Sequence, residues 1–265
     1  MEVNGYEEYK TQQSKYKLVK DIMSKNVETI SEEASMADAV KIMGEKHIGS
    51  LIVERKDDSW GIVTERDLLS RIIGVDGKIA PVRVKESMST PLITISPQFS
   101  IREAAETMMN KKGRLAVCED DKLVGVVTTS DLVKVLPDCP ETAVICDTYM
   151  SKPVVSVEEN VTIQEVAKIM GEKRIGSVIV NKKDDPYGIF TERDLISNFL
   201  AKDRTLQSKV GECASKPLIT IPSGASVHHA TYIMASKHVK RLPVMKGEKI
   251  VGIITARDLV EAYIK

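Results

Sequence analysis

A seven-residue pattern occurs four times and constrains the fold more than any other feature of the sequence. It reads glycine, two apolar residues, threonine, two variable residues and aspartate. The copies are Gly61–Asp67, Gly125–Asp131, Gly188–Asp194 and Gly252–Asp258. Successive copies are 63 or 64 residues apart. A period of this length is too long for a solenoid unit and favours a small supersecondary module that is present four times.

Each copy also carries a signal for the start of a helix 25 or 26 residues before the glycine of its pattern. In the first copy Ser35 and Asp38 form this signal, ahead of apolar residues at helical spacing. The equivalent pairs are Ser100 with Glu103, Thr162 with Glu165, and Ser226 with His229. Because start signals and apolar faces agree in all four copies, the sequence predicts the same helix in each.

Strand signals surround that helix. Residues 27–30 are a strand candidate, and the apolar runs 49–53 and 60–63 read as a hairpin around the polar turn 55–59. A second helix begins at Thr64. The predicted fold is therefore of the mixed α/β (α+β) class, with four strand–helix–strand–strand–helix (βαββα) repeats.

The repeats are related in pairs. Repeats 1 and 3 match at a constant offset, Met23 with Met150 and Gly49 with Gly176, and share the phrases KIMGEKHIGSLIV and KIMGEKRIGSVIV. Repeats 2 and 4 share the proline-led strand PLITI, at 91–95 and 217–221. This favours a duplicated pair joined at the proline-rich residues 137–141. The predicted boundaries are a polar tail at 1–17 and repeats at 18–76, 82–137, 144–202 and 208–265.

Composition narrows the partners. Lysine plus arginine equal aspartate plus glutamate at 38 each, so no net field attracts nucleic acid or anionic lipid. No apolar run approaches the ~20 residues of a membrane span, and the polar N-terminus lacks a secretory core, which predicts a cytoplasmic protein. The four cysteines form no C-x-x-C pair. Free thiols are therefore favoured over a metal site or a disulfide framework.

The threonine and aspartate of the pattern have two interpretations. Threonine followed three residues later by aspartate is a helix start, in which both residues only cap the helix. Alternatively, the helix start and the threonine hydroxyl receive a phosphate, and the aspartate accepts ribose hydroxyls. The glycine would let the backbone approach a ligand or a neighbouring strand. All four copies keep the pair, which favours a binding site. The candidates are Thr64, Asp67, Thr128, Asp131, Thr191, Asp194, Thr255 and Asp258.

Arginines add a second candidate set. Arg66, Arg193 and Arg257 precede the aspartate in three copies, where the other copy has Ser130. On the strand before the hairpin turn, serine and arginine alternate between odd and even repeats. The alternating residues are Ser50, Arg114, Ser177 and Arg241. An arginine in every second repeat suggests one receptor for an anion in each pair of repeats.

The repeated G-h-h-T-x-x-D, preceded by a strand such as IGSLIV or KRLPV, resembles the CBS domain, named after cystathionine β-synthase. The resemblance covers residues 18–265. It implies a three-stranded sheet with two helices per domain, and tandem pairs, called Bateman modules, whose clefts bind AMP, ADP, ATP or S-adenosylmethionine. It also implies ligand contacts from Thr29 and Ser156.

The resemblance further implies that the arginine of each even repeat, on the strand before the hairpin turn, contacts a phosphate held in the cleft of the other domain of its pair. Arg114 would then serve the cleft of Asp67, and Arg241 that of Asp194.

The preferred interpretation is a non-catalytic sensor that binds an adenosine nucleotide (AMP, ADP or ATP) as regulatory ligand and acts on an unidentified protein. The alternatives are an S-adenosylmethionine sensor, a nucleotide-hydrolysing enzyme and a structural scaffold. No P-loop and no nucleophile–base constellation occurs among the motifs. The two modules are expected to pack together within one chain as a flat disk. The alternative is a homodimer.

Overall fold

The structure is a computed structural model, and it describes residues 18–57, 59–71, 81–110, 114–135 and 144–265. The predicted tail 1–17 and the predicted join 137–141 lie outside the described residues, and so does the end of repeat 1 after residue 71. The strand–helix–strand–strand–helix order is present in all four repeats, as predicted.

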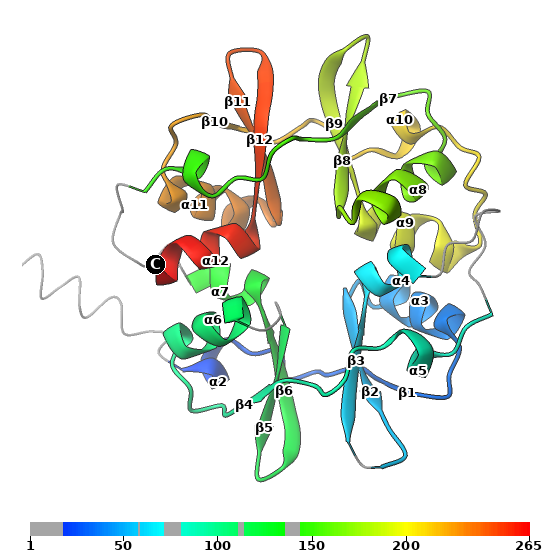
Figure 1. Cartoon of the computed structure of the whole chain (residues 1–265), viewed down its shortest axis with the longest axis vertical. Helices are drawn as coiled ribbons and strands as arrows, with labels where there is room; N and C mark the ends of the chain where they lie inside the picture. Colours follow the sequence, from blue (N-terminus) through cyan, green and yellow to red (C-terminus); the bar gives the residue numbers. More distant parts are fainter. Residues whose placement is uncertain (1–17, 58, 72–80, 111–113, 136–143) are drawn as a thin grey trace, which may run out of the picture. The chain divides into compact units, whose positions relative to one another are not determined.

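Repeat 1 shows the pattern (Figure 1). It consists of β1 (Thr29–Ser31), α3 (Met36–Glu45), β2 (Ser50–Glu54), β3 (Trp60–Thr64) and α4 (Glu65–Arg71). Strand β1 pairs with β2 in parallel, and β2 pairs with β3 as an antiparallel hairpin. The first strand begins two residues later than the sequence suggested.

The other repeats have the same sheet order, with the short first strand at one edge and the hairpin beside it. Repeat 2 consists of β4 (Thr94–Ile95), α6 (Ile101–Asn110), β5 (Arg114–Glu119), β6 (Lys122–Thr128) and α7 (Thr129–Val135). Repeat 3 consists of β7 (Ser156–Glu158), α8 (Ile163–Lys173), β8 (Ser177–Lys182), β9 (Asp185–Thr191) and α9 (Glu192–Asn198), followed by the 3-10 turn η3 (Leu200–Lys202). Repeat 4 consists of β10 (Ile221–Pro222), α11 (Val227–Lys237), β11 (Arg241–Lys246), β12 (Lys249–Thr255) and α12 (Ala256–Ile264).

The predicted helix starts are confirmed by their hydrogen bonds. The Ser35 hydroxyl accepts from the Asp38 amide, and the Asp38 carboxylate accepts from the Ser35 amide, so two otherwise unpaired donors of the first turn are satisfied. Thr162 and Glu165 form the same reciprocal pair. In α11 the Ser226 hydroxyl accepts from the amide of His229.

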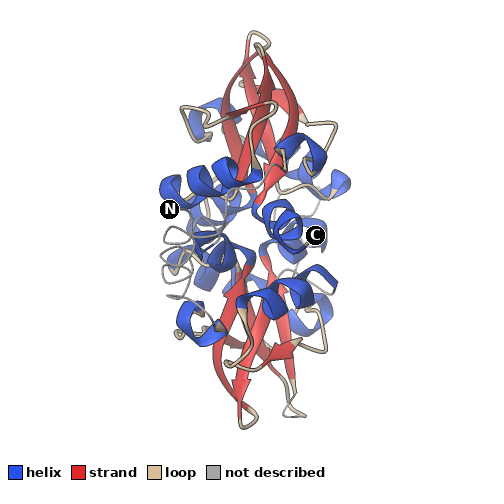
Figure 2. Ribbon diagram, turned by 90° about the vertical axis from the view of Figure 1, so that its left-hand side faces the viewer, coloured by secondary structure: helices blue, strands red, loops and turns tan. Residues whose placement is uncertain are grey.

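Alternation along the hairpin strands puts one face of each sheet against its helices. In repeat 1 Leu51, Val53 and Val63 are fully or almost fully buried against Met36 and Met43 of α3. In Figure 2 the helices lie beside one end of the strands, and the hairpin turns extend beyond them.

The chain forms two compact units that do not follow sequence order. Unit 1 contains repeats 2 and 4, and unit 2 contains repeats 1 and 3. In unit 2 the helices of the two repeats pack against each other, α3 on α9 and α4 on α8, with η3 against α3. Leu69 of repeat 1 contributes to the core of repeat 3, and Ile196, its equivalent in repeat 3, contributes to the core of repeat 1. Odd repeats therefore pack on each other within one chain, and so do even repeats.

Four short helical segments, the leaders, lie at the start of the four repeats, before the first strand of each, and no sequence signal indicated them. They contain α2 (Val19–Ile22), α5 (Val84–Ser87), the 3-10 turn η2 (Cys146–Thr148) and α10 (Val210–Cys213). Two or three residues after each leader, a serine forms an antiparallel bridge to the last strand of another repeat. These bridges are Ser24 with Val126, Ser89 with Ile62, Ser151 with Ile253, and Ser215 with Ile189.

Each leader therefore completes another repeat instead of the repeat at whose start it lies. Val84, at the start of repeat 2, is fully buried in the core of repeat 1, and Val210, at the start of repeat 4, is fully buried in the core of repeat 3. Val19, at the start of repeat 1, lies in the core of unit 1.

The proline-led strand predicted at 91–95 is shorter than expected for a related reason. The amide of Leu92 donates to Trp60 O in unit 2, at 3.0 Å, whereas Ile93 O accepts from the amide of Ala116 in unit 1, at 2.9 Å. Because the chain passes from one unit to the other here, only Thr94 and Ile95 form β4. In repeat 4 the strand of the predicted segment 217–221 begins at Ile221 and continues to Pro222.

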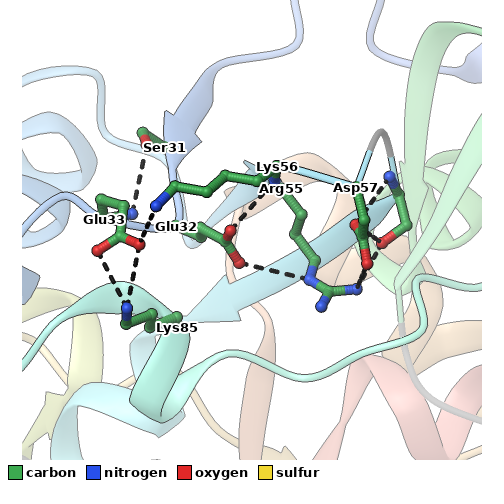
Figure 3. A network of polar contacts seen from close by, with 8 residues as sticks. Ser31, Glu32, Glu33, Arg55, Lys56, Asp57 and Lys85 are labelled. Atoms are coloured by element: carbon green, nitrogen blue, oxygen red, sulfur yellow. Dashed lines mark hydrogen bonds and ion pairs between the residues drawn. The ribbon is translucent and has the colours of Figure 1, made fainter.

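An ionic network fixes the leader α5 to repeat 1 (Figure 3). Glu33, in the turn after β1, pairs with Lys85 of α5 at 3.0 Å, with Arg83 just before α5, and with Lys56 of the hairpin turn at 2.8 Å. The neighbouring Glu32 lies 3.5 Å from Arg55. The three cations lower the pKa of Glu33 from 4.5 to about 2, chiefly through the Lys56 hydrogen bond.

Candidate functional site

The threonine and aspartate of the pattern form the same local structure in every repeat. The threonine ends the last strand, and the aspartate lies in the first turn of the following helix. In repeat 1 the amide and the hydroxyl of Thr64 both donate to Asp67 Oδ2, at 2.9 and 2.7 Å. The other repeats show the same two bonds, at 2.7–3.0 Å. The helix-capping interpretation of this pair is thus confirmed, and a ligand-binding role stays a prediction.

Capping uses only one oxygen of the aspartate. A carboxylate has about four acceptor positions on its two oxygens. For Asp67 and Asp258, no donor among the described residues bonds the other oxygen, Oδ1. The pair can therefore cap its helix and still accept hydroxyl groups of a ligand.

Repeat 2 differs at this oxygen. Lys134 Nζ lies 3.2 Å from Asp131 Oδ1, and the carboxylate side chain is 11% exposed whereas the lysine is 62% exposed. A hydroxyl group that binds Asp131 must therefore compete with this lysine. In repeat 4, burial raises the pKa of Asp258, and the charge of Glu261 raises it further, against the hydrogen bonds from Thr255.

The glycines of the pattern allow a close approach of protein, which is one of the two roles that the sequence suggested. A Cβ on Gly61 would lie 2.9 Å from Met88 Sδ and 3.3 Å from Ser89 O, both in the leader that bridges to β3. Gly125 and Gly252 face Met23 and Met150 of their leaders in the same way. The glycine therefore leaves room for the close approach of the leader.

The register of the hairpins places the alternating serine or arginine directly opposite the threonine. Arg114 pairs with Thr128 and Arg241 with Thr255. Residues directly opposite in an antiparallel pair share one face, so each arginine lies beside the threonine of its own repeat. In the odd repeats Ser50 pairs with Thr64, and Ser177 with Thr191. The predicted sharing of Arg114 with Asp67 joins residues of different units and stays a prediction.

The arginines next to the aspartates contact protein. In unit 2 Arg66 Nε lies 3.6 Å from Glu192 Oε1, and Arg193 Nε donates to Glu65 Oε1 at 3.1 Å. In unit 1 Arg257 donates to Met109 O. The two glutamates stand at variable positions of the seven-residue pattern and were not predicted as site residues, although the phrase TERD, present only in repeats 1 and 3, contains them.

The weaker candidates Thr29 and Ser156 are exposed residues at the start of β1 and β7. Each lies on the edge strand opposite to the strand that carries the threonine of the pattern, with the central strand between them. Among the described residues, neither side chain forms a hydrogen bond with a threonine–aspartate pair.

Among the described residues, no group of three or more histidine, cysteine or carboxylate side chains is placed to hold a metal ion. Cys118, Cys146 and Cys213 are free thiols, and burial raises the pKa of Cys146 to about 11. Within the same residues, no helix has both the length and the apolar character that a bilayer span requires.

Comparison with known proteins identifies the repeat. The model of the CBS domain matches residues 19–74, 84–138, 145–201 and 210–265. The chain belongs to the CBS domain family. Each CBS match contains one copy of the seven-residue pattern, so the four threonine–aspartate pairs are equivalent positions of four CBS domains.

Relatives and solved structures agree with four CBS domains. Protein MJ1404 of Methanocaldococcus jannaschii is 25% identical over 92% of this chain and 61% of its own length. The chain spans 61%, 58% and 60% of three such relatives, about three fifths of each. The crystal structure of protein MJ1225 from the same organism superposes with a TM-score of 0.74 at 21% identity, covering 93% of this chain and 99% of that one. A conserved protein of Pyrococcus horikoshii gives 0.63 at 21% identity, covering 92% and 99%. These structures show the same fold.

Proposed function

We propose that this protein is a non-catalytic sensor that binds adenosine nucleotides (AMP, ADP or ATP) at its threonine–aspartate pairs and regulates another protein. The CBS family is one of regulatory, ligand-binding domains, which supports the general part of the proposal. The observation that carries the specific part is the geometry of Asp67. One oxygen caps the helix, and the other has no donor among the described residues.

Vicinal ribose hydroxyls are a suitable partner for that second oxygen. Each hydroxyl donates one hydrogen bond, and an ionised carboxylate only accepts. A bond to a charged acceptor contributes about 1.5–3 kcal/mol, so each aspartate in an occupied site should change affinity by roughly ten- to a hundredfold. The threonine hydroxyl donates to the aspartate, which leaves its oxygen able to accept a further donor.

The matched test is the double variant Asp67→Asn with Asp194→Asn. Asparagine keeps one oxygen to accept the two bonds from the threonine, so the cap is retained. The amide nitrogen that replaces the second oxygen can only donate. We expect AMP to bind the double variant roughly ten- to a hundredfold more weakly than the parent at these two sites, by isothermal titration calorimetry, with an unchanged melting temperature.

The ligand supplies the corresponding control. 2′-Deoxy-AMP should bind the parent as weakly as AMP binds the double variant. Equal affinity of the parent for the ribose and deoxyribose forms would contradict the proposal and leave these aspartates with helix capping alone. Turnover of AMP or ATP by the parent would contradict the non-catalytic part.

A further inference from the structure

Two reciprocal ion pairs connect repeats 1 and 3 at the candidate sites of unit 2. Glu65 of α4 pairs with Arg193 of α9, and Glu192 of α9 pairs with Arg66 of α4, at 3.1 and 3.6 Å. Each glutamate side chain is only 10% exposed, whereas Arg193 is 37% and Arg66 63% exposed. The glutamates are therefore the fixed members of the pairs, and the arginines can reach solvent.

The surrounding backbone holds Glu65 in place. The amide of Glu65 donates to Gly49 O at 3.2 Å. A Cβ on Gly49 would lie 2.7 Å from Glu65 Oε2 and 3.0 Å from Arg193 Nη2, so glycine leaves room for the ion pair in this arrangement and a larger residue would displace the ends of the two side chains. The equivalent bond in repeat 3 joins the amide of Glu192 to Gly176 O.

The described part of unit 1 has no counterpart of this arrangement. Thr129 and Ala256 occupy the positions of the two glutamates, and neither residue carries a charge. The ion pairs are therefore specific to the repeats that share the TERD phrase, and their function concerns the two sites of unit 2.

We infer that Glu65 and Glu192 are positioning residues that hold Arg193 and Arg66 and thereby couple the two ligand sites of unit 2. This inference rests on the proposed function, because it takes the threonine–aspartate pairs as the sites. Each arginine directly precedes the aspartate of its own site and pairs with the glutamate of the opposite repeat. An arginine that turns to a phosphate at its own site must leave that glutamate.

The sign of the coupling follows from the burial of the glutamates. When Arg66 leaves Glu192, a buried carboxylate loses this cation, and an unpaired buried charge is costly. Release of Arg193 as well would take the cation from Glu65 too, the second of two buried carboxylates in the same unit. Arg193 is then held more tightly and is less available to a phosphate at its own site. Binding of a first phosphate-bearing ligand at one site therefore weakens binding of a second one at the other site, and the effect is reciprocal. Adenosine, which has no phosphate, binds the two sites independently.

The experiment uses the full chain with Asp131→Asn and Asp258→Asn, which weakens ribose binding in unit 1 and leaves the sites of unit 2 to be titrated. We expect the two stepwise AMP dissociation constants to differ by about five- to tenfold beyond the statistical factor, within the usual range of coupling between sites. With adenosine the additional factor should be absent. Glu65→Gln with Glu192→Gln, which keeps the side-chain shape and an accepting oxygen, should remove the additional factor for AMP.

A second measurement does not depend on substituting the glutamates. The Nε–H signals of Arg66 and Arg193 in nitrogen-15 NMR spectra, assigned with Arg→Lys variants, should move when AMP is added and stay in place with adenosine. Equal responses to the two ligands would overturn the inference.

The failures of the two proposals are distinguishable. If neither AMP nor adenosine binds this chain, the proposed function fails and the coupling with it. If AMP binds both sites with only the statistical difference, or if the two glutamine substitutions leave the additional factor unchanged, the coupling alone is wrong and the sites stand.

Discussion

Substitution of Gly44 by alanine tests the packing of repeat 1 on repeat 3. Gly44 is a buried residue near the end of α3, and a Cβ built on it would lie 2.2 Å from the Cβ of Ala201 in η3. Carbon atoms in contact prefer a separation of about 3.5–4.0 Å. The two segments would have to separate by roughly 1.5 Å to admit the methyl group, and neither partner has a flexible side chain that could move instead.

Two effects of opposite sign decide the result. Alanine is intrinsically better than glycine inside a helix by about 1 kcal/mol. Overpacking in a close-packed interior costs about 1–3 kcal/mol and occasionally more. Gly44 lies one residue before the end of its helix, where the propensity term is weakest, so the packing cost should win. We expect Gly44→Ala to lower the free energy of unfolding by about 1–2 kcal/mol, which is roughly 2–8 °C in melting temperature for a unit of this size.

The control is the reciprocal substitution Ala201→Gly. It removes the methyl group that the new one would meet, so the double variant should recover most of the stability lost in Gly44→Ala. Urea denaturation of the parent, both single variants and the double variant gives the interaction free energy. A Gly44→Ala variant that is more stable than the parent, or additive effects in the double variant, would refute the close packing of these segments.

Two further predictions concern charged groups. Lys134→Ala frees Asp131 Oδ1 from its cation. Since an exposed ion pair contributes about 0–1 kcal/mol, adenosine should bind the site of repeat 2 up to about fivefold more tightly, as measured by calorimetry. Weaker binding would show that the lysine contacts the ligand. The pKa of Glu33, lowered from 4.5 to about 2, makes its stabilisation fully present above about pH 4.5 and lost as the pH falls toward 2. The urea midpoint of Glu33→Gln should therefore lie below that of the parent at pH 7 and approach it at pH 3; a constant difference would exclude the ionised carboxylate as the cause.

The repeat architecture could be predicted because its signals are local. Each helix start needs two residues three positions apart, such as Ser35 with Asp38, and the hydrogen bonds that they form lie within one turn. The hairpins depend on adjacent apolar runs around a short polar turn. Four independent copies of these signals agree, so an error in one would have been visible in the others.

The leaders could not be predicted in the same way because their partners are distant in sequence. Val84 resembles the first apolar residue of repeat 2, and the family match for that repeat also begins there. Val84 is buried in repeat 1 because the chain after it pairs with β3 through the bridge of Ser89 with Ile62, and no local sequence pattern indicates this pairing. The proline-led strand at 91–95 was overestimated for the same reason, since its residues are divided between two units.

The candidate site was predictable in its residues and only partly in their contacts. The recurrence of both residues indicates the threonine–aspartate pair, whereas Glu65 and Glu192 stand at variable positions of the pattern, where recurrence gives no signal. They differ between odd and even repeats, although the helices of both kinds of repeat pack on each other within their unit. The crossed ion pairs that the two glutamates form in unit 2 join residues 128 positions apart and 126 positions apart, so no local pattern indicates them.

Repeats 1 and 3 share the long phrase KIMGEK(H/R)IGS(L/V)IV because its residues lie where the two repeats pack on each other. Its first glycine provides the close contact at Gly44 with η3 and at Gly171 with Leu69 O, where a Cβ would approach to 3.0 Å. Its second glycine, at Gly49, makes room for the pair of Glu65 with Arg193. In repeat 4 the position of Gly44 is taken by Ala235, and unit 1 lacks the crossed glutamates. The shared phrase therefore reflects one interface, at which repeats 1 and 3 must fit each other. A change on one side, such as Gly44→Ala, needs its compensation in the opposite repeat.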